Sequence, residues 1–449
     1  MAGCRTANTD GYRSWGRYPP AAHRAVIQVR WRSEPPDLAR LEGTVLPFGC
    51  GRSYGDCCLN DGGTLLDASH LRHFIAFDEE RGLLRCEAGV TLADILDLMV
   101  PRGWFPSVLP GTRWVTVGGA IANDIHGKNH HGAGTFGRYV SCFELLRSSG
   151  ERLVCSPERN AELFRATIGG LGLTGLILWA DVQLRRVSSS AIALERVRFG
   201  SLHEFFALSS EDQDYEYTAA WIDCTASRGR LGRGLYLRGD HASPEAAGDG
   251  AARPDGGLGG LLRVPFDAPG ALLNPLTVSV FNALYYRSQI SPRVRKVVPG
   301  EAFFFPLDSV RGWNRLYGRH GFLQYQCVVP DGEGGAAVRG ILERVGRHRQ
   351  ASFLAVIKRF GDLPSPGMLS FPRPGVTLAL DFPYRGARTL EMLEELDELV
   401  VGAGGKVYPA KDARMSADTF RSYFPLWRQF AKHVDPKFSS SFWRRVSGA

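Results

Sequence analysis

The pattern of apolar and polar positions divides the first 190 residues into short strands and helices. Apolar runs bounded by Gly and Asp, at 64–67 and 83–87, are typical of strands. In 91–99 apolar residues recur at helical spacing behind a Thr that has an Asp three residues on, which predicts a helix with a capping box. Further predictions are a hairpin turn at 149–150, a helix over 160–167 and a long strand over 176–187.

From about residue 190 the strand pattern starts again. Five strands are predicted, at 193–199, 216–224, 321–329, 351–360 and 375–383. The amphipathic pattern of 389–405 predicts a helix stopped by glycines, and 416–434 predicts a helix with Ser416 as its N-cap. Residues 240–260 lack periodicity and are rich in Gly, Ala, Pro and Asp, which predicts a loop that is either inert or a mobile lid.

Composition narrows the class of protein. With 449 residues the chain is long enough for about two domains, and its 44% hydrophobic and 22% charged residues are ordinary for a soluble protein. No run approaches a membrane span, and the N-terminus lacks the apolar core of a signal peptide. Nine cysteines without CxxC spacing favour the reduced thiols of a cytoplasmic protein.

The net charge of +8 comes mainly from scattered arginines. Because no compact basic run is present, nucleic-acid binding is not favoured. The same basic surface leaves open a peripheral contact with anionic lipid at the inner face of a membrane. Lysine is rare, with seven in the chain. Because the pKa of a lysine shifts readily, each lysine is a weak indication of a functional position.

The segment 117–137, VGGAIANDIHGKNHHGAGTFG, suggests three kinds of site. His126 and His130 have the i, i+4 spacing of two metal ligands on a helix, but Gly127 and Gly132 disfavour a helix and no Glu stands between the histidines. We therefore predict no metal site. The other two readings are a phosphate-binding loop and a loop pressed against a flat cofactor.

One segment also matches the sequence pattern of a dinucleotide-binding fingerprint. GLGLTG, 170–175, matches G-x-G-x-x-G, but a predicted helix precedes it and a predicted strand follows it. A Rossmann site needs the opposite order, so that the pyrophosphate meets a helix N-terminus. We predict that this segment is not a Rossmann site.

Two Gly-rich loops, 47–56 and 110–127, make a stronger case together. Their small residues allow close backbone approach, and Arg52 and Ser53 can serve a phosphate. Two such loops can wrap one long, flat, phosphorylated ligand with backbone N–H groups.

Six motifs in order resemble the vanillyl-alcohol-oxidase type of FAD-binding oxidoreductase: PFGCGRSYGD, VTVGGAIANDIHGKNHH, GLTG, FLQYQ, IKRFG and YPAKD. Within that type the chain is most similar to the decaprenyl-phosphoryl-ribose 2-oxidase group, because HGKNHH and AKDAR are specific to it. The resemblance covers nearly the whole chain except 240–260. It implies an α+β, two-domain FAD-binding (PCMH/VAO-type) fold. The FAD domain would be 1–190 completed by 405–449, and a substrate domain, 191–404, would cover the flavin with an antiparallel sheet.

The resemblance also implies the cofactor contacts. They fall on both Gly-rich loops and on two later positions: Phe48, Gly49, Gly51, Arg52, Ser53, Tyr54, Gly55, Asp56, Gly111, Thr112, Thr116, Val117, Gly118, Gly119, Asn123, Ile125, His126, Ile177 and Tyr408. Many relatives attach FAD covalently through a His in the first loop. Here that loop reads RSYG, so the resemblance implies non-covalent FAD.

Oxidation by a flavin requires a group that takes the substrate's hydroxyl proton or stabilises the alkoxide. The resemblance points to Lys411 for holding and polarising this hydroxyl, with His126 and Tyr54 beside it. A surface ion pair with Asp412 is the alternative for Lys411, and His126 is either the base or a wall of the pocket. His130 and His131 are expected to be structural.

The implied substrate contacts are Lys128, Lys358, Gln324, Gln326, Trp221 and Ala379. The two lysines would hold a substrate phosphate as point charges, or else be solvated chain ends. Ala379 stands where mycobacterial members of the group carry a reactive Cys, which puts pocket chemistry and substrate choice in question.

The implied reaction is FAD-dependent oxidation of a secondary hydroxyl (C2) of a polyprenyl-phosphoryl ribose, or a related pentose, to the 2-keto sugar. This is the first half of an epimerisation to arabinose for the cell wall, and a short-chain NAD(P)H-dependent reductase would act next. The alternative is a soluble sugar, alditol or aldonolactone oxidase that uses oxygen. A flavin-free binding or assembly partner on the same fold is a hypothesis of a different class.

Overall fold

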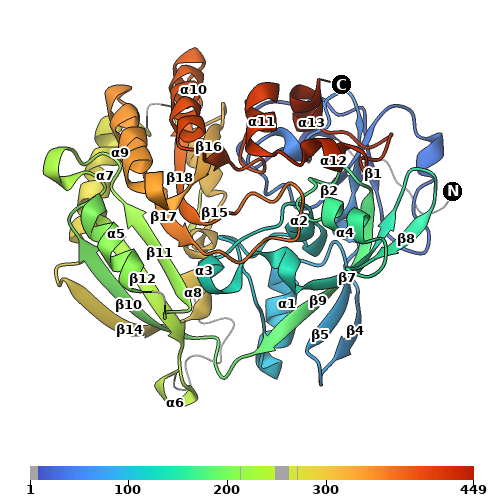
Figure 1. The fold of residues 1–449 in the computed structure, drawn as a ribbon, viewed down its shortest axis with the longest axis horizontal. Coiled ribbons are helices and arrows are strands. Elements are labelled where there is room, and N and C mark those ends of the chain that lie inside the picture. Colours follow the sequence, from blue (N-terminus) through green and yellow to red (C-terminus); the bar gives the residue numbers. More distant parts are fainter. Residues whose placement is uncertain (1–8, 213, 248–261, 271, 449) are drawn as a thin grey trace.

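The computed structural model describes residues 9–212, 214–247, 262–270 and 272–448. Its mixture of helices and mostly antiparallel sheets fits an α+β fold with two domains. In Figure 1 a large sheet with its helices occupies one half, and smaller sheets built from the N-terminal third occupy the other.

The N-terminal third forms two sheets. A small parallel sheet has the order β1 (Ala25–Gln28), β3 (Thr64–Asp67), β2 (Val45–Phe48). An antiparallel sheet has the order β4 (Phe74–Asp78), β5 (Leu83–Glu87), β9 (Leu176–Arg186), β7 (Val140–Leu146), β8 (Arg152–Cys155), and β6 (Trp104–Pro106) also pairs with β9. The predicted strands of this region are therefore confirmed.

The local signals of this region are also confirmed. Helix α1 (Leu92–Met99) has the predicted capping box: Thr91 Oγ1 accepts from Asp94 N at 3.1 Å, and Asp94 Oδ2 accepts from Thr91 N at 2.9 Å. The turn between β7 and β8 has Gly150 at φ +87°. Helix α4 (Ala161–Thr167) precedes β9, as predicted.

The second half of the chain builds one eight-stranded antiparallel sheet. Its order is β14 (Arg293–Val298), β10 (Ile192–Phe199), β12 (Gly234–His241), β11 (Tyr217–Ile222), β17 (Ala355–Phe360), β18 (Gly375–Pro383), β16 (Phe322–Val329), β19 (Lys406–Val407). All five predicted strands lie in it. The outer face is covered by α5 (Leu202–Glu211), α9 (Asp331–Arg347) and α10 (Ala387–Gly402).

Along the central strands, side chains alternate between the face covered by helices and the opposite, inner face of the sheet. On β16, Leu323, Tyr325 and Cys327 belong to the core beneath the helices, whereas Gln324 and Gln326 lie on the opposite face. The register places Gln326 beside Ala379, Ala379 beside Val356 and Val356 beside Trp221. A row of side chains therefore crosses four strands on the inner face.

The C-terminal segment returns to the small parallel sheet. It contains α11 (Ala417–Tyr423), α12 (Trp427–Ala431) and α13 (Ser441–Ser447), and Val45 N donates to Lys437 O at 2.8 Å. The predicted Ser416 cap is confirmed, because its side chain accepts from Thr419 N. The single helix predicted over 416–434 is wrong, since Pro425 has no N–H to continue it.

Several elements differ from the predictions or were not predicted. The Gly-rich loop 110–127 contains a short helix, α2 (Val117–Ala122), and the predicted loop 240–260 contains α6 (Pro244–Ala247). The remainder of that loop, from 248 on, lies outside the described residues. Strands β12 and β14 and helices α7 (Pro275–Arg287), α8 (Gly300–Phe304) and α9 were not predicted.

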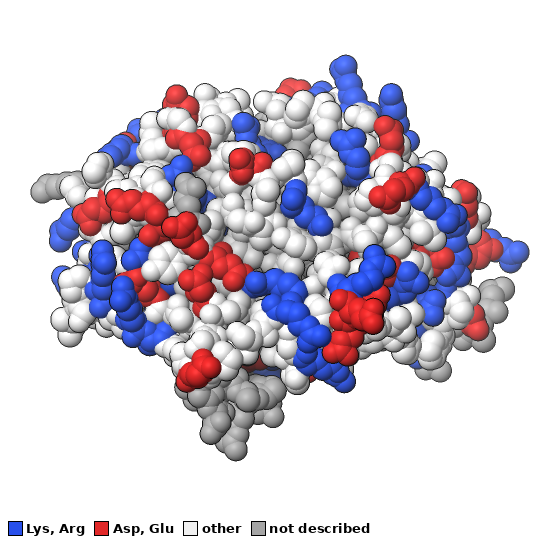
Figure 2. Space-filling view, turned by 60° about the horizontal axis from the view of Figure 1, so that its bottom comes forward, with Lys and Arg blue, Asp and Glu red and all other residues white. Residues whose placement is uncertain are grey.

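Charges of both signs are mixed on the surface. On the face drawn in Figure 2, Lys and Arg side chains alternate with Asp and Glu and form no continuous basic band. Within the described ranges, none of the helices combines the length and apolarity needed to cross a bilayer.

Candidate active site

A cavity of about 1910 Å³ lies between the inner face of the eight-stranded sheet and the N-terminal sheets. Sites for single drug-sized ligands usually span roughly 300–1000 Å³. The cavity therefore has room for a dinucleotide-sized cofactor together with a substrate. No group of three or more His, Cys, Asp or Glu side chains in the described part of the chain is placed to hold a metal.

The first Gly-rich loop offers an anion site. The five consecutive amides from Gly49 to Ser53 donate to no acceptor among the described residues. Gly51 adopts φ +59°, and Arg52 Nε is buried without a partner in the same range. Successive free N–H groups beside a guanidinium are a typical cradle for phosphate.

The second Gly-rich loop behaves differently. At the start of α2, the amides of Val117 and Gly118 donate to Val90 O and Ala88 O, and Gly119 N donates to Thr116 Oγ1. The expectation that both loops offer backbone N–H groups to a phosphate is therefore wrong for this turn. Its glycines serve close packing instead, since a Cβ on Gly118 would approach Ala88 to 3.1 Å.

Sixteen of the nineteen predicted cofactor positions line the cavity. Gly55, Asp56 and Val117 do not. A Cβ on Gly55 would lie 1.6 Å from Asp412 O, so Gly55 is pressed against the C-terminal segment. Asp56 is buried and binds Arg445 of α13 at 2.7 Å, and Val117 is part of the core.

The fingerprint-like segment 170–175 lies between α4 and β9, so the order of elements is not that of a Rossmann site, as predicted. It nevertheless contributes Leu171, Gly172 and Gly175 to the cavity wall. Both glycines have positive φ, +76° and +144°, which a residue with a Cβ rarely adopts.

His126 faces the cavity from the second loop. Gln326 Nε2 donates to His126 Nε2 at 3.0 Å, so the ring proton is on Nδ1, which is buried and has no partner among the described residues. Burial, with Lys358 and other nearby cations, lowers the pKa of His126 well below its usual value. The ring is therefore neutral and presents one N–H donor.

His130 and His131 lie away from the cavity wall. The His130 ring packs 4.2 Å from that of Phe360, and His131 Nε2 lies 2.7 Å from Tyr215 O. Helix α3 (His130–Ala133) begins after His126, so His126 and His130 share no helix.

Lys411 reaches into the cavity from the segment after β19. Its Nζ lies 3.6 Å from the centroid of the Tyr54 ring, and Tyr54 N donates to Ala410 O at 2.9 Å. Asp412 pairs instead with Arg445 at 3.1 Å, so the alternative of a Lys411–Asp412 surface ion pair is wrong. Burial lowers the pKa of Lys411, and the carboxylate of Asp381 opposes this shift.

Asp381 is the buried carboxylate of this cluster. It accepts from Gln324 Nε2 at 2.5 Å and from Tyr317 OH at 3.3 Å. Burial raises the pKa of Asp381. No role for Asp381 was expected from the sequence motifs, although Asp381 lies two positions beyond Ala379 on β18 and must therefore face the same side.

Lys128 and Lys358 both line the cavity, so the reading of solvated chain ends is wrong. Each donates to one backbone carbonyl, Lys128 to Phe304 O at 3.0 Å and Lys358 to Gly127 O at 3.3 Å. Burial, with Lys358 nearby, lowers the pKa of Lys128 to about 7, and burial lowers the pKa of Lys358 to about 8. Two adjacent cationic groups with spare donors favour an anion between them.

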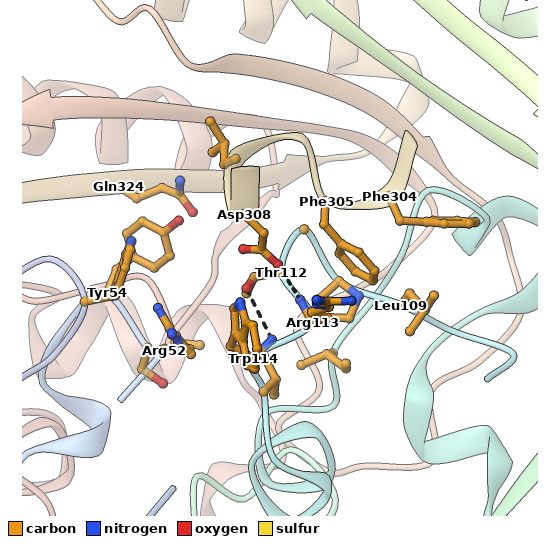
Figure 3. A pocket seen from close by; sticks show the side chains of 18 of the residues that line it. Arg52, Tyr54, Leu109, Thr112, Arg113, Trp114, Phe304, Phe305, Asp308 and Gln324 are labelled. Carbon is orange, nitrogen blue, oxygen red and sulfur yellow. Dashed lines mark hydrogen bonds between the residues drawn. The ribbon is translucent and has the colours of Figure 1, made fainter. Parts of the chain in front are cut away.

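The cavity is bordered by a contact between distant segments (Figure 3). Arg113 N donates to Asp308 Oδ2 at 2.9 Å, and the Arg113 guanidinium pairs with Glu301 of α8. Phe304 and Phe305 lie beside Leu109 in the same view, and Tyr54 points toward Gln324. No sequence pattern pointed to Asp308 or these phenylalanines.

The chain is similar to known flavin-binding proteins. A family model for an FAD binding domain matches residues 37–156. The chain is 38% identical to decaprenylphosphoryl-β-D-ribose oxidase of Mycolicibacterium smegmatis over 452 residues, 96% of each chain.

The chain belongs to the decaprenylphosphoryl-β-D-ribose oxidase family. It is an FAD-dependent oxidoreductase. It is also 37% identical to an uncharacterized Streptomyces coelicolor protein, over 80% of this chain and all of that one. Similarity to a putative D-arabinono-1,4-lactone oxidase of Neurospora crassa is lower, 28% over 42% of this chain and 34% of that protein.

The residues present fit FAD. The free amides of Gly49–Ser53 and the guanidinium of Arg52 would hold the pyrophosphate, and the unpartnered Nδ1 of His126 would meet a ring acceptor. Tyr408 closes the same wall, because its hydroxyl donates to Asn123 O at 2.9 Å.

Proposed function

We propose that the protein oxidises the C2 hydroxyl of a polyprenyl-phosphoryl ribose, or a related pentose, to the 2-keto sugar, as the first half of an epimerisation to arabinose. Similarity to the mycobacterial oxidase over nearly the full chain supports this substrate class. The observation that carries the proposal is Lys411 Nζ above the Tyr54 ring in a cavity that also holds Lys128 and Lys358.

Each of these side chains has a distinct role in the proposal. FAD, when bound, supplies the acceptor for the hydride equivalent. Lys411, with its lowered pKa, holds the reacting hydroxyl and takes its proton. Tyr54 supports the ammonium with its ring face, and Gln324 fixes Asp381 behind it.

Lys128 and Lys358 bind the substrate phosphate in the proposal. Bound phosphate restores their full charge, because a nearby anion raises the pKa of each ammonium. Gln326, Ala379 and Trp221, from the row across the sheet, form the floor beneath the sugar. His126 acts as a wall and N–H donor, since its Nε2 is already engaged by Gln326.

We also infer that FAD is held without a covalent bond, because the first loop contains no His. A short-chain NAD(P)H-dependent reductase would then act on the 2-keto product. A peripheral contact with a membrane is also part of the proposal.

The variant Lys411→Ala tests the proposal. It should keep its bound flavin but reduce that flavin at least about 100-fold more slowly when mixed anaerobically with a prenyl-phosphoryl pentose. Bleaching of the visible flavin absorbance in a stopped-flow instrument measures this rate. Lys432→Ala, on the exposed surface, is the matched control and should react at the wild-type rate.

Two results would reject the proposal. A wild-type rate in Lys411→Ala would remove Lys411 from the chemistry. Rapid peroxide release with free sugars, and no bleaching with a prenyl-phosphoryl pentose, would favour the soluble sugar, alditol or aldonolactone oxidase instead.

A further inference from the structure

Exposed apolar side chains are concentrated in one stretch. Fifteen large apolar residues are exposed in the described part of the chain, and ten of them lie between residues 262 and 297. Along α7, Leu276 is 73% exposed, Val280 52% and Leu284 63%, and Ile290 just beyond is 85% exposed. We call these four residues the α7 face. Soluble proteins rarely leave so many apolar side chains together in water.

Helix α7 leaves most of its large apolar side chains exposed and buries only Val278 and Asn282. Its buried side carries Asn282, fully buried, whose Nδ2 donates to Asp223 Oδ1 and to Ser352 O, both at 3.2 Å. A surface helix normally turns its apolar stripe inward. The α7 helix is held to the protein partly by polar bonds while its leucines point outward, an arrangement suited to an apolar environment outside.

Charge around the α7 face has one dominant sign. Between 262 and 298 the sequence holds five basic residues and one acidic residue, Asp267. Asp267 pairs with Arg17. Arg287 and Arg293 are exposed and form no ion pair with any residue that the structure describes. Basic side chains beside an exposed apolar stripe match a surface of anionic phosphates above hydrocarbon.

Helix α7 also borders the cavity, through side chains next to the α7 face. The Tyr285 ring, from the same helix, lies 4.7 Å from that of Trp221, which ends the row across the sheet. Phe281 stacks on Tyr285 at 6.0 Å, and both rings line the cavity. Figure 1 places α7 at the end of the molecule remote from both chain termini.

We propose that the α7 face docks on an anionic phospholipid bilayer, with Arg287 and Arg293 at the headgroups. Its use in catalysis rests on the proposed function, since a lipid-linked sugar would then pass Phe281 and Tyr285 to enter the cavity. The docking itself needs no substrate and is measured without one.

Flotation of the flavin-loaded protein with vesicles tests the docking. The wild type should float with vesicles of phosphatidylcholine and phosphatidylglycerol. The triple variant Leu276→Gln, Val280→Gln, Leu284→Gln should bind to the vesicles at least tenfold less. Each Leu or Val side chain that leaves water for the bilayer contributes substantially to the free energy of binding, and Gln does not. Gln keeps good helix propensity, so flavin content and melting temperature should stay at wild-type values.

Two further variants separate hydrophobic and electrostatic contributions. Val401→Gln with Leu426→Gln removes exposed apolar side chains elsewhere, each 42% exposed, and should float like the wild type. Arg287→Gln with Arg293→Gln should weaken binding about fivefold per charge, and only with anionic vesicles.

Three outcomes would overturn the proposal. One is failure of the wild type to float, and another is unchanged flotation of the triple variant. The third is that the wild type is an oligomer, the triple variant is a monomer and neither floats with vesicles. This result would make the α7 face a self-association surface. Turnover of a short-chain, water-soluble prenyl-phosphoryl pentose without vesicles reports on the proposed function separately and should be equal in wild type and triple variant.

Discussion

At the scale of single residues, the proposed chemistry involves two buried groups that influence each other's pKa, Lys411 and Asp381. Asp381 has no exposed surface and is fixed by Gln324 and Tyr317, and its charge raises the pKa of Lys411 against the effect of burial. We therefore expect Asp381 to be a positioning residue that also tunes the pH at which Lys411 becomes neutral.

The variant Asp381→Asn tests this role. If neutral Lys411 takes the hydroxyl proton, the rate of flavin reduction rises as pH passes upward through the Lys411 pKa. Removing the carboxylate withdraws the interaction that favours the ammonium, so this pKa falls further and the rise moves to lower pH. Anaerobic flavin reduction across pH measures the midpoint. Asp418→Asn, 95% exposed, should leave it in place, and an unmoved or alkaline-shifted midpoint in Asp381→Asn contradicts the role.

Much of this residue-level chemistry follows from sequence alone. Lysines are rare in the chain and the motifs place Lys128, Lys358 and Lys411, all of which line the cavity. Asp381 could have been found from strand alternation with Ala379. Asp308 could not, because its contact with Arg113 joins positions far apart in sequence through tertiary packing.

At the scale of elements, the two Gly-rich loops have separate tasks. The first has five consecutive free amides beside the cavity, whereas at the start of α2 the second uses the amides of 117–119 for hydrogen bonds within the protein and packs tightly. The sequence shows that both loops are rich in small residues, which allow backbone conformations that larger residues rarely adopt. It does not show that the carbonyls of Ala88 and Val90 lie in reach of α2, which decides the difference.

The variant Gly49→Ala tests how the loops fit together. Its Cβ would lie 2.5 Å from Thr116 Oγ1, which caps α2, so either the cap or the first loop must move. We expect FAD affinity to fall about fivefold or more, since loss of a cap alone costs about 1 kcal/mol. Fluorescence titration of the apoprotein with FAD measures this. Gly346→Ala, on α9 with open space around it, should bind FAD like the wild type; equal affinity in Gly49→Ala would show that the loop adapts.

Helix α7 shows why element prediction succeeds in one place and fails in another. Residues 91–99 carry apolar positions inward behind a capping box, so pattern and structure agree. In α7 Leu276, Val280 and Leu284 face outward, and the buried side carries Asn282 beside Val278. A rule that assigns apolar residues to the core has no means of recognising such a helix.

At the scale of the whole molecule, the cavity is where the sheets meet. Its wall draws on the parallel sheet through Phe48, on the antiparallel sheet through Ile177 and on the eight-stranded sheet through Gln326. A ligand that fills it should hold these parts together, because binding only to the folded state stabilises that state.

Removing the flavin tests this coupling. The apoprotein, prepared by salt dialysis, should melt several degrees below the holoprotein, and added FAD should restore the melting temperature. Differential scanning fluorimetry measures both. Riboflavin at the same concentration should restore far less, since it lacks the phosphates that the amides of Gly49–Ser53 would bind. Equal melting temperatures with and without FAD would contradict the coupling.

Arg445 on α13 binds both Asp56, two residues after Tyr54, and Asp412, the residue after Lys411. Asp56 and Arg445 are separated by 389 positions, so the ribosome makes them far apart in time. Early segments can fold while synthesis continues. The contact between Arg445 and Asp412, the neighbour of Lys411, can form only after residue 445 has left the ribosome, so the segment that carries this lysine gains its support late in synthesis.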